Sequence, residues 1–298
     1  MKTLLLRNSS GRPPLRRGFP VVLFALALLL LIASSANGVI SSEGLLRNVS
    51  TRLAVLTGEN VLIAGFTVPF SQQILVRALG PTLTNFGVTG ALADPTIALY
   101  NSSGALIATN DNWKDTNQAA IAGTGKAPPN DNESAILASL SPGGYTAIVR
   151  GKNNTTGVGL VEAYGIVPSG FSTFISNISS RGFVGTGNDV MIGGFIGDGG
   201  PSLQIIVRAL GPTLTQFGIS NALANPTLEL HDGNGNILAF NDNWQDTNQA
   251  AIQATGLAPP NSNESAILTF IDFGTSITAI VRGKNNTTGV AVFEVYVP

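Results

Sequence analysis

The sequence predicts an all-β protein with two tandem antiparallel β-sandwich domains, jelly-roll-like in topology, after an N-terminal signal peptide. Two observations support this prediction. The chain beyond the signal peptide is duplicated, since the motif VRALGPTLT begins at Val76 and again at Val207. Each copy consists of short apolar runs separated by turns rich in Gly, Pro and Asn, a pattern typical of antiparallel strands without intervening helices.

The duplication extends through nearly the whole chain with little drift in register. NDNW begins at Asn110 and returns at Asn241, and NESAIL begins at Asn132 and returns at Asn263, in both cases 131 residues later. A unit of about 130 residues buries roughly two thirds of its unfolded surface, so each copy is large enough to fold alone, unlike a short solenoid repeat. We therefore expect residues 39–167 and 168–298 to form separate units, with a short linker starting at Pro168.

The first 38 residues have the order of a secretory signal peptide. Five basic residues without an acid precede an apolar run at residues 21–33, and small residues follow up to Gly38. This run has 13 residues, whereas a transmembrane helix needs about 20. We expect cleavage after Ala36 or Gly38, with an uncleaved anchor as the alternative. The protein is then secreted or at the cell surface of a bacterium, with no membrane insertion after cleavage.

Composition narrows the chemistry and the partners. The chain has no cysteine, which excludes disulfides, thiolate metal sites and cysteine nucleophiles. Without the five basic residues of the signal peptide, 11 of the 16 Lys and Arg remain against 17 acids, a formal charge of −6. This charge disfavours nucleic acid and anionic membranes. Extracellular glycans and proteins remain as the expected partner classes.

Within the first copy, six short runs rich in Val, Ile, Leu, Thr and aromatic residues predict strands. They lie at residues 61–68, 74–79, 96–100, 105–108, 145–150 and 158–164. Gly and Asn at residues 101–104 and 232–235 supply the positive φ of hairpin turns. The one helix-like stretch, at residues 117–122, returns at residues 248–253.

A polar segment at residues 150–157, repeated at residues 282–289, contains Gly, Lys and Thr. These residue types occur in phosphate-binding loops, but the order Gly-x-x-x-x-Gly-Lys-Ser/Thr and the following helix are missing. We expect a hairpin connection between two strands.

Oxygen-bearing side chains that recur in both copies gather on a loop after a predicted strand. They are Asn110, Asp111, Asp115 and Glu133, and their counterparts Asn241, Asp242, Asp246 and Glu264. Such ligands suit a hard cation, so Ca²⁺ is the one cofactor that the sequence indicates. The alternative is that these Asn and Asp side chains cap turns by bonding to nearby backbone groups. The EF-hand spacing is absent.

Two other recurrent features have a structural and a functional interpretation. Strand alternation places Arg77 on the same face as Leu75 and Leu79, so its guanidinium needs a carboxylate partner, for which Glu133 and Glu162 are the candidates. Trp113 and Trp244, the two tryptophans, stand beside amides and hydroxyls. This combination occurs on sugar- and protein-binding surfaces, and packing is the alternative.

The run at residues 96–113, followed by the run at residues 143–151, resembles bacterial pre-peptidase C-terminal domains in its strand, hairpin, Asn-Asp and closing Gly-x-Tyr strand. Those domains are β-sandwich appendages of secreted enzymes, some of which bind calcium and substrate. The resemblance implies calcium at Asp111, Asp115 and Glu133. It does not cover RALGPTLT. The whole unit also resembles a tandem module, marked by RALGP, NDNW and YTAIVRG, in large secreted or surface proteins of environmental bacteria, a family without an established activity.

These observations predict a non-catalytic binding or adhesion module, stabilised by Ca²⁺ if the loops bind it. Structural spacer domains of an extracellular assembly are the first alternative. The second is a carboxylate-dependent hydrolase, for which Asp111 with Glu133 is the one candidate pair. A binding module predicts saturable attachment that is lost when the Trp113 loop is changed, whereas a spacer predicts no ligand.

Overall fold

The computed structural model describes residues 45–166, 175–198 and 202–298, so the expected signal peptide and the start of the linker at Pro168 lie outside the described residues. Antiparallel strands dominate, which confirms the all-β prediction. Within the described ranges, no helix is long and apolar enough to cross a membrane.

Within the described ranges, each copy contributes eight strands. The first has β1 (Leu45–Val55), β2 (Leu62–Val68), β3 (Gln72–Leu79), β4 (Pro95–Asn101), β5 (Leu106–Asn110), β6 (Ser134–Leu140), β7 (Gly143–Gly151) and β8 (Gly157–Ile166). The second has β9 (Asn177–Val184), β10 (Met191–Asp198), β11 (Ser202–Leu210), β12 (Pro226–His231), β13 (Ile237–Asn241), β14 (Ser265–Asp272), β15 (Ser276–Gly283) and β16 (Gly289–Tyr296).

Short helices fill some of the connections. The α-helices α2 (Gln118–Gly123) and α3 (Gln249–Ala254) form at the expected helix-like stretch of each copy. The 3-10 helices η1 (Pro81–Phe86) and η3 (Pro212–Phe217) follow the RALG segments, with a proline in the first turn and a left-handed glycine at the end. The segment at residues 150–157 joins β7 to β8, but the expected hairpin is wrong. β7 pairs with β2 and β4 whereas β8 pairs with β1 and β3, so the segment crosses from one sheet to the other.

The sequence misses β1 and β6 of the first copy. Arg47, Asn48, Ser50 and Arg52 interrupt the apolar pattern of β1, and β6 consists mainly of Ser, Ala and Leu, which lack the β-branched and aromatic character of a strand. Both strands form because their neighbours supply the ladder hydrogen bonds and a core to pack against. The pairing therefore overrides weak local propensity in these segments.

Within each copy the strands form two facing sheets. In the first copy the orders are β6-β3-β8-β1 and β5-β4-β7-β2. In the second they are β14-β11-β16-β9 and β13-β12-β15-β10. Numbered within a copy, these are 6-3-8-1 and 5-4-7-2, the arrangement of an eight-stranded jelly roll. The jelly-roll expectation is therefore confirmed for each copy.

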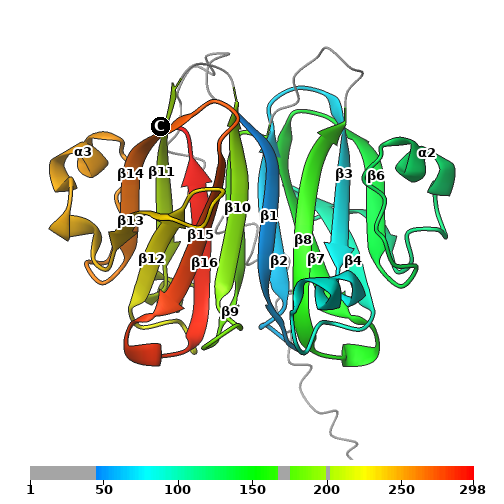
Figure 1. The fold of residues 1–298 in the computed structure, drawn as a ribbon, viewed down its shortest axis with the longest axis horizontal. Helices are drawn as coiled ribbons and strands as arrows, with labels where there is room; N and C mark the ends of the chain where they lie inside the picture. The colour runs from blue at the N-terminus through cyan, green and yellow to red at the C-terminus, as the bar shows by residue number, and fades with distance from the viewer. Residues whose placement is uncertain (1–44, 167–174, 199–201) are drawn as a thin grey trace, which may run out of the picture.

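The two copies share their sheets. β1 of the first copy pairs with β10 of the second, and β2 pairs with β9, so both sheets run through the molecule from one copy into the other. Figure 1 shows β1 and β10 side by side at the centre, with α2 and α3 at opposite ends. This pairing differs from the expected pair of separate units. It occurs because β1 and β2 would otherwise be free sheet edges with unpaired backbone groups.

The junction, here called the seam, has approximate two-fold symmetry. Residues 50–52 of β1 lie opposite residues 192–194 of β10, and their counterparts 179–181 of β9 lie opposite residues 63–65 of β2. Ala54 pairs directly with its own counterpart Phe183. Each contact thus occurs twice, as in an isologous dimer interface. The chain has the architecture of a dimer whose two protomers are covalently joined.

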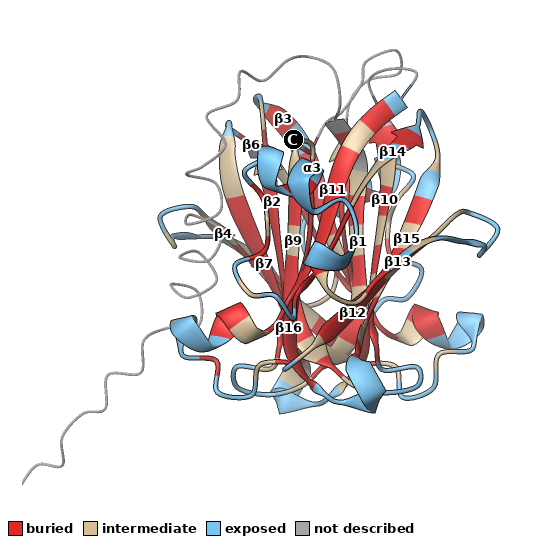
Figure 2. Ribbon diagram, turned by 90° about the vertical axis from the view of Figure 1, so that its left-hand side faces the viewer, coloured by how far each residue is buried: buried red, intermediate tan, exposed pale blue. Residues whose placement is uncertain are grey.

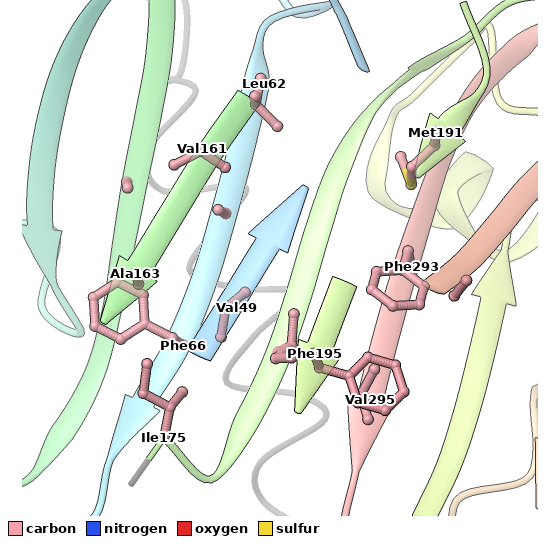
Figure 3. Close-up of a cluster of buried hydrophobic side chains, with 14 of the residues drawn as sticks. Val49, Leu62, Phe66, Val161, Ala163, Ile175, Met191, Phe195, Phe293 and Val295 are labelled. Carbon is pink, nitrogen blue, oxygen red and sulfur yellow. The ribbon is translucent and has the colours of Figure 1, made fainter. Parts of the chain in front are cut away.

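One apolar core runs through both copies. Figure 3 shows Val49, Phe66 and Val161 of the first copy in the same cluster as Phe195 and Phe293 of the second. Buried residues follow the central strands and exposed residues the connecting loops (Figure 2). This core is continuous across the seam, so the two copies stabilise one another.

Departures from symmetry in this core are complementary. A Cβ on Gly193 would lie 2.2 Å from the ring of Phe293, and a Cβ on Gly182 would lie 2.6 Å from Leu53. The first copy has Ala64 and Leu53 at the positions of these two glycines. Thr51 and its counterpart Ser180, both fully buried, share a 2.6 Å hydrogen bond between the sheets. Leu53 of the first copy is thus matched by Gly182 of the second, and within the second copy Phe293 is matched by Gly193.

Candidate functional site

The RALGP arginine of each copy pairs with a glutamate directly opposite it in the sheet. Arg77 on β3 faces Glu162 on β8, and the Nε to Oε2 distance is 2.7 Å. Arg77 also donates to the Lys126 carbonyl, and its guanidinium lies 5.2 Å from the centre of the Tyr164 ring. The sequence left Glu133 and Glu162 open as partners, and the structure selects Glu162. This interaction is a structural ion pair.

The second copy repeats this arrangement with deeper burial. Arg208 pairs with Glu294 and donates to the Leu257 carbonyl, beside the ring of Tyr296. Burial alone would lower the pKa of Arg77 and of Arg208, but the adjacent glutamate and tyrosine raise it above its ordinary value. Side-chain exposure is 16% for Arg77 and 5% for Arg208. The first-copy guanidinium is therefore the more accessible of the two.

Glu133 occupies a different site from the one expected. It is fully buried, and its Oε1 accepts hydrogen bonds from the backbone amides of Gly80 and Thr82. Its Oε2 accepts from the Thr82 hydroxyl and the Asn130 amide. Glu264 makes the same four contacts with Gly211, Thr213 and Asn261. This carboxylate therefore fixes the start of η1 and of η3 by satisfying amides that have no other partner.

The Asn-Asp loop is also held by internal hydrogen bonds. Asn110 accepts from the Ala135 amide at 2.8 Å and donates to the Asn112 carbonyl and the Thr116 hydroxyl. Asp115 accepts from Asn112 at 3.2 Å. Asn241 and Asp246 of the second copy have the equivalent partners. Asn110 thereby links edge strand β5 of one sheet to edge strand β6 of the other.

Asp111 points to a lysine. Its Oδ2 lies 2.6 Å from Lys152 Nζ, in the connection between β7 and β8, and Asp242 pairs with Lys284 in the same way. The candidate ligands of each copy thus have separate partners. Among the described residues, no group of three or more His, Cys, Asp or Glu side chains has a geometry that could hold a metal ion. Of the contacts that these Asn and Asp side chains make in the first copy, only the bond from Asn110 Nδ2 to the Asn112 carbonyl reaches a nearby backbone group, as turn capping requires. The others are an ion pair and hydrogen bonds to side chains or a distant amide. Both members of the Asp111 and Glu133 pair are thus engaged in structural contacts.

Trp113 and Trp244 are packed rather than displayed, with exposures of 8% and 6%. Trp113 lies with Leu75, Ile121 of α2 and Ala135 on the outer face of the first sheet. Trp244 has the equivalent position against Ile206 and Ile252. The loop between β5 and β6 therefore folds over the outer face of the sheet that contains β3 and β6, where it forms a small second core. Little of either indole is left for a ligand.

A groove of about 420 Å³, here called the seam groove, lies on the outer face of the sheet where the two copies join. β1, β3 and β8 of the first copy contribute one part of its lining, η1 and the residues after it a second, and β10 with Thr278 of β15 a third. On the β10 side, Gly194 carries no side chain next to the lining residue Ser50. Pockets that bind small ligands are typically about 300–1,000 Å³, so the groove is large enough for one ligand group.

The seam groove combines an apolar wall with a charged end. Leu79, Leu83, Phe86, Val88 and Leu160 form the wall, and Phe86 is 78% exposed. The charged end consists of Arg52, Arg77 and Glu162. A second hollow of about 490 Å³ lies beyond η1, and its lining, between Pro81 and Asn132, carries no charged side chain.

Among the charged groups that line the seam groove, Arg52 has unused hydrogen-bonding capacity. Its Nε is buried and has no hydrogen-bond partner among the described residues. Burial lowers the pKa of Arg52, and the charge of Asp189 opposes this effect. Glu162 already accepts from Arg77 and from the Tyr164 hydroxyl. The charged end therefore has one paired and one incompletely satisfied arginine, which favours an anionic ligand group.

The second copy fills the equivalent region with its own side chains. Leu210, Leu214, Ile219, Val290 and Val292 form a buried cluster against which Phe183 and Phe217 pack. The first copy has Ala54 at the position of Phe183, and Phe86, the counterpart of Phe217, is exposed. The seam groove is therefore open in the first copy, where the filling phenylalanine is absent.

Sequence reasoning did not identify this groove because it searched for residues that recur in both copies. The groove lies where the copies differ, since Ala54, on the same face of β1 as the lining residues Ser50 and Arg52, stands at the position of Phe183. A comparison of the copies for large-to-small replacements at apolar positions would have singled out this position. Its location on the seam depends on tertiary pairing.

No protein-family model matches the chain, and no curated protein matches it. Among solved structures, the chain is similar to a crystal structure of a DUF4785 family protein from Legionella pneumophila subsp. pneumophila str. Philadelphia 1, with 9% sequence identity and a TM-score of 0.24. The match covers 86% of this chain and 84% of that one. At this TM-score the similarity supports no conclusion about function.

Proposed function

We propose that the protein is a secreted or cell-surface, non-catalytic binding module and that the seam groove is its ligand site. The observation that supports this proposal is the open groove itself. It has a mostly apolar wall, an exposed aromatic ring and an arginine with an unsatisfied buried Nε. Binding sites commonly combine an apolar surface with a few polar groups in this way.

Differentiation between the two copies also supports binding over a spacer role. A spacer needs only stability, and the second copy shows that the same region can be closed by Phe183 and Phe217. The first copy leaves Phe86 exposed to water instead. Exposed aromatic side chains beside an arginine are typical of interaction hot spots.

The test is saturable binding of residues 39–298 to immobilised panels of glycans and of peptides. Phe86→Ser should abolish the binding, because it removes the exposed ring from the groove. Phe270→Ser is the matched control, since Phe270 on β14 is also exposed, at 65%, and does not line the groove. Binding that survives Phe86→Ser, or no saturable binding to either panel, would instead support the spacer interpretation.

A further inference from the structure

The internal duplication indicates which chemical group fits the seam groove. Five apolar residues of the second copy pack around Phe183, and the same five positions of the first copy are Leu79, Leu83, Val88, Val158 and Leu160. The backbone frame and the apolar character of both sets are the same. The phenyl ring of Phe183 is therefore a built-in example of an occupant for this frame.

We propose that the seam groove binds an aromatic side chain of a protein partner, with an adjacent carboxylate of that partner paired to Arg52. This inference rests on the proposed function and specifies the ligand of the same site. The partner supplies the ring that Phe183 supplies in the second copy.

The apolar wall argues for a peptide side chain rather than a sugar. Leu79, Leu83, Val88 and Leu160 offer no hydrogen bonds, whereas a sugar hydroxyl placed against them would lose its hydrogen bonds to water without replacement. An aromatic ring loses nothing comparable and gains burial of roughly 25 cal/mol for each Å² of apolar surface. Phe86, at the same groove, can pack against the incoming ring.

The charged end argues for a carboxylate beside the ring. Arg77 is paired with Glu162, whereas Arg52, which also lines the groove, feels the charge of Asp189 but forms no ion pair with a described residue. In the second copy the counterpart Arg181 lies 3.7 Å from Glu59, so that arginine already has a carboxylate partner. Asn188 stands at the position equivalent to Glu59, and the neighbouring Asp189 acts on Arg52 only at longer range, without an ion pair. A partner carboxylate would complete at Arg52 the pair that Glu59 forms at Arg181.

A single substitution that fills the seam groove with a phenyl ring provides a test. Ala54→Phe places in the first copy the residue that fills the second, on the same strand face as Ser50 and Arg52, which line the groove. Because the second copy accommodates this ring, the variant should fold. Thermal unfolding and circular dichroism verify that it does.

The experiment selects phage-displayed random peptides on immobilised residues 39–298 and then measures synthetic copies of the enriched peptides by fluorescence anisotropy. We expect enriched peptides to carry Phe, Tyr or Trp next to Asp or Glu. Ala54→Phe and Arg52→Gln should each weaken binding about tenfold or more. Replacing the aromatic residue of the peptide by Ala, or its acid by Lys, should have a similar effect. Phe270→Ser should leave binding unchanged.

The outcomes separate this inference from the proposed function. Enriched peptides without an aromatic residue, or equal binding to the parent and to Ala54→Phe, overturn the inference. Glycan binding that is lost in Phe86→Ser, without peptide binding, also overturns it and leaves the proposed function standing. If neither the peptide library nor the glycan panel yields saturable binding, both proposals fail.

Discussion

Replacement of Glu133 by Gln tests whether this carboxylate is a structural cap or a metal ligand. Its two oxygens accept four hydrogen bonds, three from backbone amides and one from the Thr82 hydroxyl. Glutamine keeps the shape but has one acceptor oxygen. In the best orientation this oxygen faces Gly80 and Thr82, and the new NH₂ group faces Thr82 Oγ1, which can rotate to accept, and the Asn130 amide, which cannot.

The expected loss follows from these contacts. The Asn130 amide loses its partner in a buried position, and the amides of Gly80 and Thr82 lose a charged acceptor. A hydrogen bond to a charged group contributes about 1.5–3 kcal/mol, and an orphaned buried donor costs about 1–3 kcal/mol. We therefore expect Glu133→Gln to lower the free energy of unfolding by about 2–4 kcal/mol, a large part of the roughly 5–15 kcal/mol typical of a native protein.

Urea unfolding of residues 39–298 in metal-free buffer measures this loss as a shift of the midpoint at constant slope. Asp131→Asn is the matched control, because it removes the same charge two residues away from a side chain that is 68% exposed. We expect that control to stay within about 1 kcal/mol of the parent. The reasoning is refuted if Glu133→Gln unfolds within about 0.5 kcal/mol of the parent, or if Ca²⁺ stabilises the parent and not the variant.

Three other perturbations test the fold and the loops. Gly193→Ala should cost about 1–3 kcal/mol in urea unfolding, because the new methyl group would overlap the Phe293 ring; a neutral result would mean that the core of the second copy is loosely packed beside the seam. Thr51→Val should cost about 1–3 kcal/mol by leaving the buried Ser180 hydroxyl unpaired. Adding Ser180→Ala should restore at least half of that loss, whereas additive losses would show that the hydroxyl pair is unimportant. Millimolar Ca²⁺ should leave the midpoint of thermal unfolding unchanged, because the candidate ligands already have protein partners; a clear increase that Asp111→Ala abolishes would reinstate the metal site.

Local pattern was sufficient for most of the fold. The six predicted runs of the first copy correspond to β2, β3, β4, β5, β7 and β8, and the helix-like stretch corresponds to α2. These elements have strong apolar character or explicit turn residues, so short-range chemistry specifies them. The sequence pattern did not predict β1 and β6, because polar and small residues mask the alternation of their apolar side chains. They are strands only because neighbouring strands complete their hydrogen-bond ladders.

The candidate site could be predicted in part. Pairing of Arg77 with a glutamate follows from the cost of an unpaired guanidinium on an apolar strand face, and Glu162 satisfies it through strand register. The roles of Glu133 and Trp113 did not follow, because residue type alone cannot tell a carboxylate that binds backbone amides from one that binds a cation. That distinction depends on which amides the tertiary fold brings within reach.

By itself, the sequence determined that the chain is duplicated, all-β and free of cysteine chemistry, because periodicity, turn residues and composition are local properties. Only the tertiary structure decided that the two copies share their sheets and form a groove where they meet. Edge pairing of β1 with β10 and of β2 with β9 joins residues more than a hundred positions apart. The replacement of Phe183 by Ala54 matters only on that shared surface. The neighbours that would surround a larger side chain there are remote in the sequence, so the sequence alone does not show that a space is left open.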